Sequence, residues 1–235
     1  MQTISTLYYY MSNIPRPIYF IISIPVVLIA LVFHEVSHGY ASYKLGDPTA
    51  RSLGRLSLNP LKHLDPVGAL CMLIFRFGWA RPVPINSRYF KKPRRDMAIT
   101  AFAGPLCNFV LAFISIFLYY VFFWAIYHLF GNLQPSDFII KFLAYFLVFL
   151  QISHVMNLSL GIFNLIPVPP LDGSRVLYVF LPPKYYFGVM KYERYISFAL
   201  LLLLWAGFLD TPLSTLVSLA SRGMEFIVKL IPFNF

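Results

Sequence analysis

The chain has 235 residues, of which 59% are hydrophobic and 12% are charged, and its mean hydropathy is +0.70. Soluble domains carry about twice that charged fraction, so the composition excludes an ordinary soluble protein and indicates an integral membrane protein. The formal net charge is +10, but the basic residues gather in loops that flank apolar stretches. This pattern sets membrane topology, and we therefore predict contact with the lipid bilayer and no nucleic-acid partner.

The first long apolar stretch, residues 18–43, is long enough to cross a membrane and carries Glu35 as its only charged residue. It contains the sequence H-E-V-S-H, and on a helix His34 and His38 lie about 40° apart, so both imidazoles can reach one metal ion. H-E-x-x-H on a helix is typical of zinc sites in which the Glu is a general base. An unpaired carboxylate in the bilayer core costs at least ~2.5–3.5 kcal/mol, which favours a functional Glu35 over a chance match.

Residues 44–96 form the longest polar stretch and are predicted to be an insertion on the cytoplasmic side. Between residues 44 and 95 there are eleven Lys or Arg and two acids, which places this region inside, the N-terminus outside and the His pair near the cytoplasmic face. Residues 67–75 are apolar but too short to cross, which favours a re-entrant or interfacial segment. Alternating prolines in residues 78–86 favour an extended edge strand that can pair with an incoming peptide, with an ordinary surface loop as the equal alternative.

Two further spans are predicted at residues 97–128 and 138–173. The first begins with G-P-L-C-N at residues 104–108, which puts small and polar groups where helices pack closely. The second contains His154, which is either a fourth metal ligand, a proton relay or a hydrogen-bonded interior residue, and we favour the interior residue. After it, residues 195–209 form a short predicted span, and residues 211–235 form either a span or an amphipathic surface helix.

The span at residues 138–173 ends irregularly, in N-L-I-P-V-P-P-L-D-G at residues 164–173. Three prolines within four positions cannot continue a helix, and broken backbone at membrane depth is tolerated only where it lines a protein-enclosed cavity. Asp172 follows the break and can point back into the bundle. It is either a third, carboxylate ligand to a His-His zinc, which leaves the fourth position for water, or the N-cap of a helix that begins at Ser174.

These patterns predict an all-α polytopic membrane protein with a single membrane-embedded domain over residues 1–235. We expect about four to six transmembrane helices and a small β or re-entrant insertion on the cytoplasmic side.

The H-E-V-S-H sequence and the proline-broken run that ends in Asp172-Gly173 together resemble the site-2 protease family of intramembrane zinc metalloproteases, in its compact form without a PDZ or CBS domain. The G-P-x-x-N and G-W-A-R-P-V-P-I-N sequences extend this similarity over most of residues 33–177. The resemblance implies one Zn²⁺ held by His34, His38 and Asp172, with Glu35 as the general base. It also implies that Asn164 holds the substrate or stabilises its reacting carbonyl. The residues that match the family's substrate-pairing strand are Pro82, Val83, Pro84, Ile85 and Asn86.

The function implied by this resemblance is hydrolysis of a peptide bond in or near a transmembrane segment of a membrane-bound protein substrate, as part of regulated intramembrane proteolysis. The expected location is the cytoplasmic membrane of a prokaryote, and a regulatory membrane partner is a further expectation. The alternatives are a non-proteolytic membrane zinc protein, either a transporter or a substrate-binding scaffold, and a membrane-embedded lipid hydrolase. Transport needs a continuous polar path across the bilayer, whereas the polar residues here gather toward one face.

Overall fold

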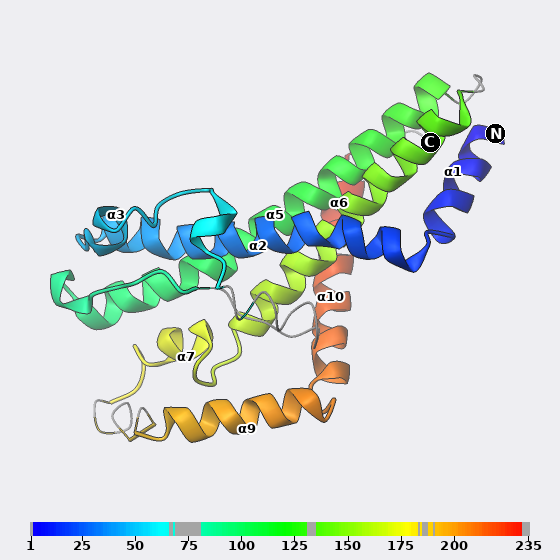
Figure 1. Cartoon of the computed structure of the whole chain (residues 1–235). Helices are drawn as coiled ribbons and strands as arrows, with labels where there is room; N and C mark the ends of the chain where they lie inside the picture. Colours follow the sequence, from blue (N-terminus) through cyan, green and yellow to red (C-terminus); the bar gives the residue numbers. More distant parts are fainter. Residues whose placement is uncertain are drawn as a thin grey trace. The chain divides into compact units, whose positions relative to one another are not determined.

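The computed structural model describes residues 2–65, 68, 81–130, 135–182, 184, 188–189 and 191–231, and this part of the chain is helical (Figure 1). Its α-helices are α1 (Gln2–Ser12), α2 (Arg16–Lys44), α3 (Thr49–Ser52), α5 (Pro93–Phe130), α6 (Asp137–Asn164), α7 (Asp172–Leu177), α9 (Glu193–Trp205) and α10 (Asp210–Lys229). Two short 3-10 helices are η1 (Pro60–Lys62) and η2 (Ser87–Tyr89). The predicted all-α class is confirmed, and none of the described residues forms a β-strand.

Within the described part of the chain, three helices, α2, α5 and α6, are long and apolar enough to cross a membrane. Helices α9 and α10 form a pair bent by 82° at a short break, and the described residues hold up to four candidate spans if this pair counts as one. The integral membrane character is therefore confirmed, whereas the count of four to six spans is not confirmed and stays a prediction. The re-entrant segment expected at residues 67–75 lies, apart from Gly68, outside the described residues.

The chain divides into two compact units, and unit 1 takes residues 1–28, 109–158 and 217–235. Its core is an apolar cluster in which Leu7 of α1 packs with Ile126 of α5 and Leu147 of α6. His154 is buried in this unit, with Nδ1 2.9 Å from the carbonyl oxygen of Ala112 and Nε2 2.8 Å from the hydroxyl of Ser221. Both ring nitrogens are engaged, which supports the interior residue over a metal ligand.

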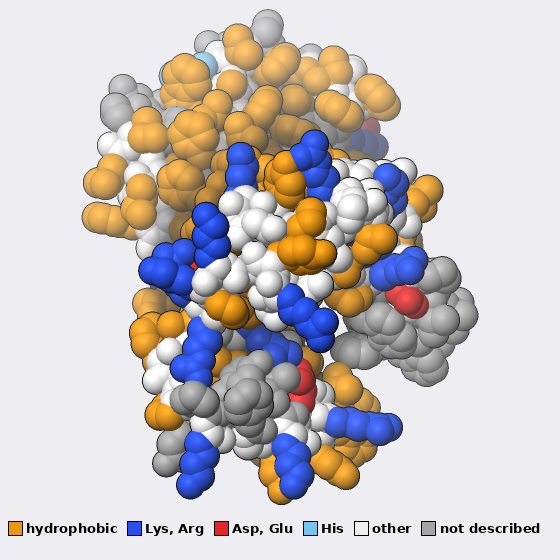
Figure 2. All heavy atoms as spheres, turned by 90° about the vertical axis from the view of Figure 1, so that its left-hand side faces the viewer, with side chains coloured by type: hydrophobic (Ala, Val, Ile, Leu, Met, Phe, Trp, Pro, Cys, Tyr) orange, Lys and Arg blue, Asp and Glu red, His pale blue; other side chains and the backbone are white. Residues whose placement is uncertain are grey.

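Unit 2 takes residues 29–108 and 159–216 and contains both sequence motifs. Helix α6 ends at Asn164, where the proline-rich run begins, and α7 starts at Asp172 after a turn that includes a cis peptide bond between Pro169 and Pro170. Figure 2 shows the face on which α3 and the start of α5 lie, with Lys and Arg side chains spread over it and few acidic side chains among them.

Residues 81–86 of unit 2, which we call the extended segment, belong to no helix or strand in the described part of the chain, and Asn86 at its end has extended backbone angles. The edge strand predicted from the alternating prolines is not confirmed there, and its pairing with a substrate stays a prediction.

Candidate metal centre

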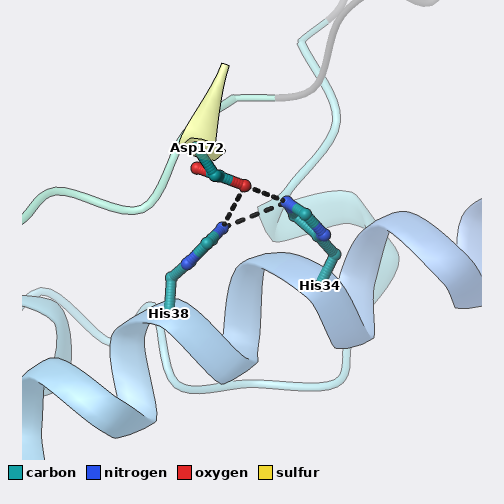
Figure 3. A group of neighbouring side chains, drawn as sticks. All are labelled: His34, His38 and Asp172. Atoms are coloured by element: carbon teal, nitrogen blue, oxygen red, sulfur yellow. Dashed lines mark hydrogen bonds and ion pairs between the residues drawn. The ribbon is translucent and has the colours of Figure 1, made fainter. Parts of the chain in front are cut away.

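Three side chains converge in unit 2, two from α2 and one from the first residue of α7 (Figure 3). The Nε2 atoms of His34 and His38 are 3.0 Å apart, and Asp172 Oδ2 lies 3.1 Å from the first and 3.2 Å from the second. Both imidazoles are buried. Among the described residues, this is the one group of His, Cys, Asp or Glu side chains that could hold a metal ion.

Helix α5 fixes the orientation of both imidazole rings through their other nitrogens. His38 Nδ1 lies 2.7 Å from the carbonyl oxygen of Thr100, which can only accept, so this nitrogen carries the hydrogen. His34 Nδ1 lies 2.6 Å from Asn108 Oδ1, and the amide nitrogen of Asn108 donates to the carbonyl of Ala30, which assigns Oδ1 as the acceptor from His34. In the neutral rings both Nε2 atoms therefore present lone pairs toward Asp172.

The three converging atoms fit a zinc ion. Two imidazole lone pairs and a carboxylate oxygen, 3.0 to 3.2 Å apart, repel one another unless a cation lies between them. In a tetrahedral zinc site with bonds of about 2.0–2.2 Å, ligand atoms lie about 3.3–3.6 Å apart, close to the spacing seen here. Three protein ligands with an open fourth position are the donor set of catalytic zinc sites.

Two glycines let the backbone approach this centre. A Cβ atom at Gly104 of α5 would lie 2.4 Å from His38 Nε2 and 2.8 Å from His34 Cε1, so only glycine leaves room for both rings. A Cβ atom at Gly173 would lie 2.2 Å from the carbonyl oxygen of Leu165, so glycine allows α7 to begin against the turn that follows α6. The sequence indicated close packing at Gly104 but did not show that the neighbours are the metal-site rings.

Glu35 contacts the extended segment that the prolines predict. Its Oε2 atom accepts a hydrogen bond of 2.9 Å from the backbone N–H of Val83, a buried residue. The structure therefore brings the predicted general base and the predicted substrate-pairing segment together, beside the two histidines of the same helix.

With this geometry in place, the comparison with protein families is decisive, because the model of peptidase family M50 matches residues 19–204. The chain belongs to peptidase family M50. The resemblance to site-2 proteases, drawn from two motifs, is thereby confirmed. No solved structure matches the chain.

Relatives of this M50 chain occur in bacteria and archaea. The chain is 38% identical over 226 residues to YwhC of Bacillus subtilis (strain 168), described as a candidate zinc metalloprotease, and the match covers 95% of this chain and 94% of YwhC. It is 31% identical to Rip2 of Mycolicibacterium smegmatis, also described as a candidate zinc metalloprotease, over 70% of this chain and 59% of Rip2. It is 26% identical to the zinc metalloprotease MJ0392 of Methanocaldococcus jannaschii, over 77% of this chain and 40% of that protein.

In this M50 chain the extended segment is held at both ends by charged residues that the sequence analysis did not single out. The Arg55 guanidinium donates to the carbonyl oxygens of Arg81 and Pro82, and Asp47 Oδ2 accepts the N–H of Asn86 at 2.8 Å. These partners are distant in sequence, and no local pattern connects them.

Asp47 is fully buried and accepts several hydrogen bonds. Burial acts to raise the pKa of its carboxyl group, but hydrogen bonds from the hydroxyl and N–H of Thr49, the N–H of Asn86 and the hydroxyl of Ser42 outweigh it and hold the pKa below its usual value. The carboxylate is therefore ionised at neutral pH and ties the loop after α2 to the end of the extended segment.

Asn164 is predicted to act on the substrate beside the metal centre, but the described residues show no contact between it and that centre. Its side-chain amide donates to the carbonyl of Leu160, one turn earlier in α6, at 3.0 Å, and no hydrogen bond in the described part of the chain joins it to the three converging side chains. A role in holding the substrate therefore stays a prediction.

Proposed function

We propose that this M50 peptidase hydrolyses a peptide bond in or near a transmembrane segment of a membrane-bound protein substrate, with Glu35 as its general base. The observation that carries this proposal is the convergence, within 3.2 Å, of two imidazole nitrogens from the helix that bears Glu35 and one carboxylate oxygen from α7. The family acts on membrane-embedded substrates, and the apolar helices α2, α5 and α6 suit that setting.

One Zn²⁺ is the cofactor, and His34 Nε2, His38 Nε2 and Asp172 Oδ2 are the proposed ligands. When bound there, zinc supplies a Lewis acid that polarises a carbonyl and lowers the pKa of a water ligand to about 7. Asn108 and the carbonyl of Thr100 hold the rings in the tautomer that leaves both Nε2 atoms free to bind.

Glu35 moves the proton. It follows His34 in the sequence, and its carboxylate can take a proton from the attacking water and return it to the leaving amine. In the substrate-free chain Glu35 Oε2 accepts the N–H of Val83. A substrate backbone that pairs with Val83 would take over this N–H and leave the carboxylate free to accept a proton.

The extended segment offers the substrate backbone donors and acceptors beside Glu35. The Val83 N–H points to Glu35, whereas the carbonyls of Arg81 and Pro82 both accept from Arg55, and Pro82 and Pro84 carry no N–H. An unwound substrate would pair with the backbone of Val83 and Ile85, which follow these two prolines.

The charge distribution and the relatives support proposals for topology, location and regulation. The excess of Lys and Arg in residues 44–95 supports a cytoplasmic position for this region, with the N-terminus outside and the site near the cytoplasmic face. Prokaryotic relatives support the cytoplasmic membrane of a prokaryote as the location. Regulated intramembrane proteolysis, the general role of the family, would place the enzyme under a regulatory membrane partner or prior substrate trimming.

The test measures zinc and cleavage in parallel on purified wild type, Glu35→Gln and Asp172→Ala in detergent, with a panel of model transmembrane substrates. Wild type and Glu35→Gln should each hold about one zinc. Cleavage by Glu35→Gln should fall about 100- to 10,000-fold, since it lacks the base, and Asp172→Ala should lose metal and activity. A Glu35→Gln protein as active as wild type would refute the general-base assignment, and a zinc-loaded wild type that cuts nothing would favour a transporter or a scaffold.

A further inference from the structure

A cationic cavity borders the extended segment of unit 2. Its volume is about 550 Å³, and its lining includes the side chains of Arg55, Lys62 and Arg81 together with Pro82 and Pro84. None of its described lining residues is acidic. Three basic residues and no acidic one among the described lining residues favour an anionic occupant.

Two of the three positive charges of this cavity, those of Arg55 and Lys62, are held in place by neutral acceptors. Arg55 is only 9% exposed and donates to the carbonyls of Lys62, Arg81 and Pro82, while its Nε atom has no hydrogen-bond partner in the described part of the chain. Lys62 Nζ donates to the carbonyl of Gly54 at 3.2 Å. Carbonyl oxygens fix these groups but do not neutralise them, so their charge remains available to a ligand.

The cavity lies on one face of the extended segment. Side chains alternate between the two faces of an extended chain, so Pro82 and Pro84 share the face that lines the cavity, and Val83 turns to the other. Val83 packs there against α2, where its Cγ1 would lie 3.0 Å from a Cβ atom at Gly39. A substrate strand paired beside Glu35 would present every second side chain to the Pro82 and Pro84 face, next to the cations.

We propose that this cavity is a specificity subsite for an acidic side chain, Asp or Glu, of the protein substrate close to its scissile bond. This rests on the proposed function. A substrate side chain fits better than a lipid head group because the cavity wall is the segment that would pair with the substrate, and because Arg55 binds that segment's own carbonyls.

A subsite for an acidic side chain would let the enzyme distinguish its substrate from most other membrane proteins. Cytoplasmic ends of transmembrane segments are usually rich in Lys and Arg, which the cavity's cations would repel. Selection would then come from attraction of one acidic residue and from repulsion of common basic flanks.

The test compares model substrates that are identical except for Glu, Gln or Lys at one position, with this position moved along the residues that flank the cleavage site. The full-length enzyme in detergent should cut the Glu substrate about five- to tenfold faster, in kcat/KM, than the Lys substrate at one position. Arg81→Glu and Lys62→Glu should reverse this preference, so that the Lys substrate is cut faster than the Glu substrate, while the zinc content stays that of wild type. Arg88→Glu, an exposed residue that does not line the cavity, should leave the preference unchanged.

Equal cleavage of Glu, Gln and Lys substrates at every position would overturn the subsite and leave the protease intact, whereas a zinc-loaded enzyme that cuts none of them would overturn both. Assays in vesicles of different lipid composition distinguish a bound lipid head group from a bound substrate side chain. If Arg81→Glu changes cleavage of all three substrates equally, and only in phosphatidylglycerol and not in phosphatidylcholine vesicles, the cavity binds an anionic head group and the proposal is wrong.

Discussion

Two acceptor atoms of α5 fix the tautomer and the ring orientation of the two histidines. Asn108 accepts the Nδ1 hydrogen of His34, whereas Thr100 serves His38 through its main-chain carbonyl. Asn108→Ala removes the first acceptor and should weaken zinc binding about 10- to 100-fold, because the ring loses its fixed tautomer and orientation. Competition with a chromophoric chelator measures this affinity.

The matched control for Asn108→Ala is Thr100→Ala, which keeps the carbonyl and removes a buried hydroxyl without a hydrogen-bond partner in the described part of the chain. Its zinc affinity should equal that of wild type. If both variants lose zinc to the same extent, packing of α5 and not the orientation of His34 explains the loss.

Gly104 is a second decisive residue, because even one methyl group there would overlap both rings. Gly104→Ala should force the rings or α5 to shift and lower cleavage about 100-fold or more, since misplacement by about 1 Å has that effect. Zinc content and rate are measured together, with Gly223→Ala as the control, where a Cβ atom meets nothing within 4 Å. A Gly104→Ala enzyme of normal rate would show that the centre tolerates this overlap.

At the scale of elements, Asp47 joins the loop after α2 to the extended segment. Asp47→Asn replaces a buried acceptor of several hydrogen bonds and should lower stability by about 1–3 kcal/mol. Because the folded pKa of Asp47 lies below its unfolded value, wild type holds this advantage above about pH 4 and loses it as the pH falls through the folded pKa.

Thermal unfolding in detergent between pH 3 and pH 7 measures the Asp47 effect. The difference in melting temperature between wild type and Asp47→Asn should be constant near neutrality and shrink in acid. A wild-type advantage that grows as the pH falls would contradict the depressed pKa.

The elements differ in how far local sequence predicts them. The charge-free run at residues 97–128 predicts α5 from its own composition. The prolines after Asn164 likewise predict where α6 ends. Helix α1 was not predicted from its sequence. The anchoring of residues 81–86 was not predictable either, because Glu35, Asp47 and Arg55 reach it from positions far away along the chain.

In the whole molecule, the metal centre combines two ligands that are close in sequence with a third that is distant in sequence. His34 and His38 are one helical turn apart, so the sequence alone brings them together. Asp172 comes from α7. Its chemistry and the family resemblance favour a role as zinc ligand over a role as helix N-cap. The structure has no side-chain cap from Leu171, the residue before α7, and it places the Asp172 carboxylate against both histidines.

This distant third ligand makes zinc a link between separate helices of unit 2, and removing zinc should therefore lower stability without unfolding them. Free zinc at 1,000 times its dissociation constant adds about 4.1 kcal/mol to folded-state stability. A chelator should lower the melting temperature of wild type while circular dichroism at low temperature keeps its helical content, because buried helices satisfy their own backbone hydrogen bonds. Asp172→Ala, which lacks a ligand, should show little shift. An equal shift in that variant would mean that zinc stabilises the chain from a site other than the three converging side chains.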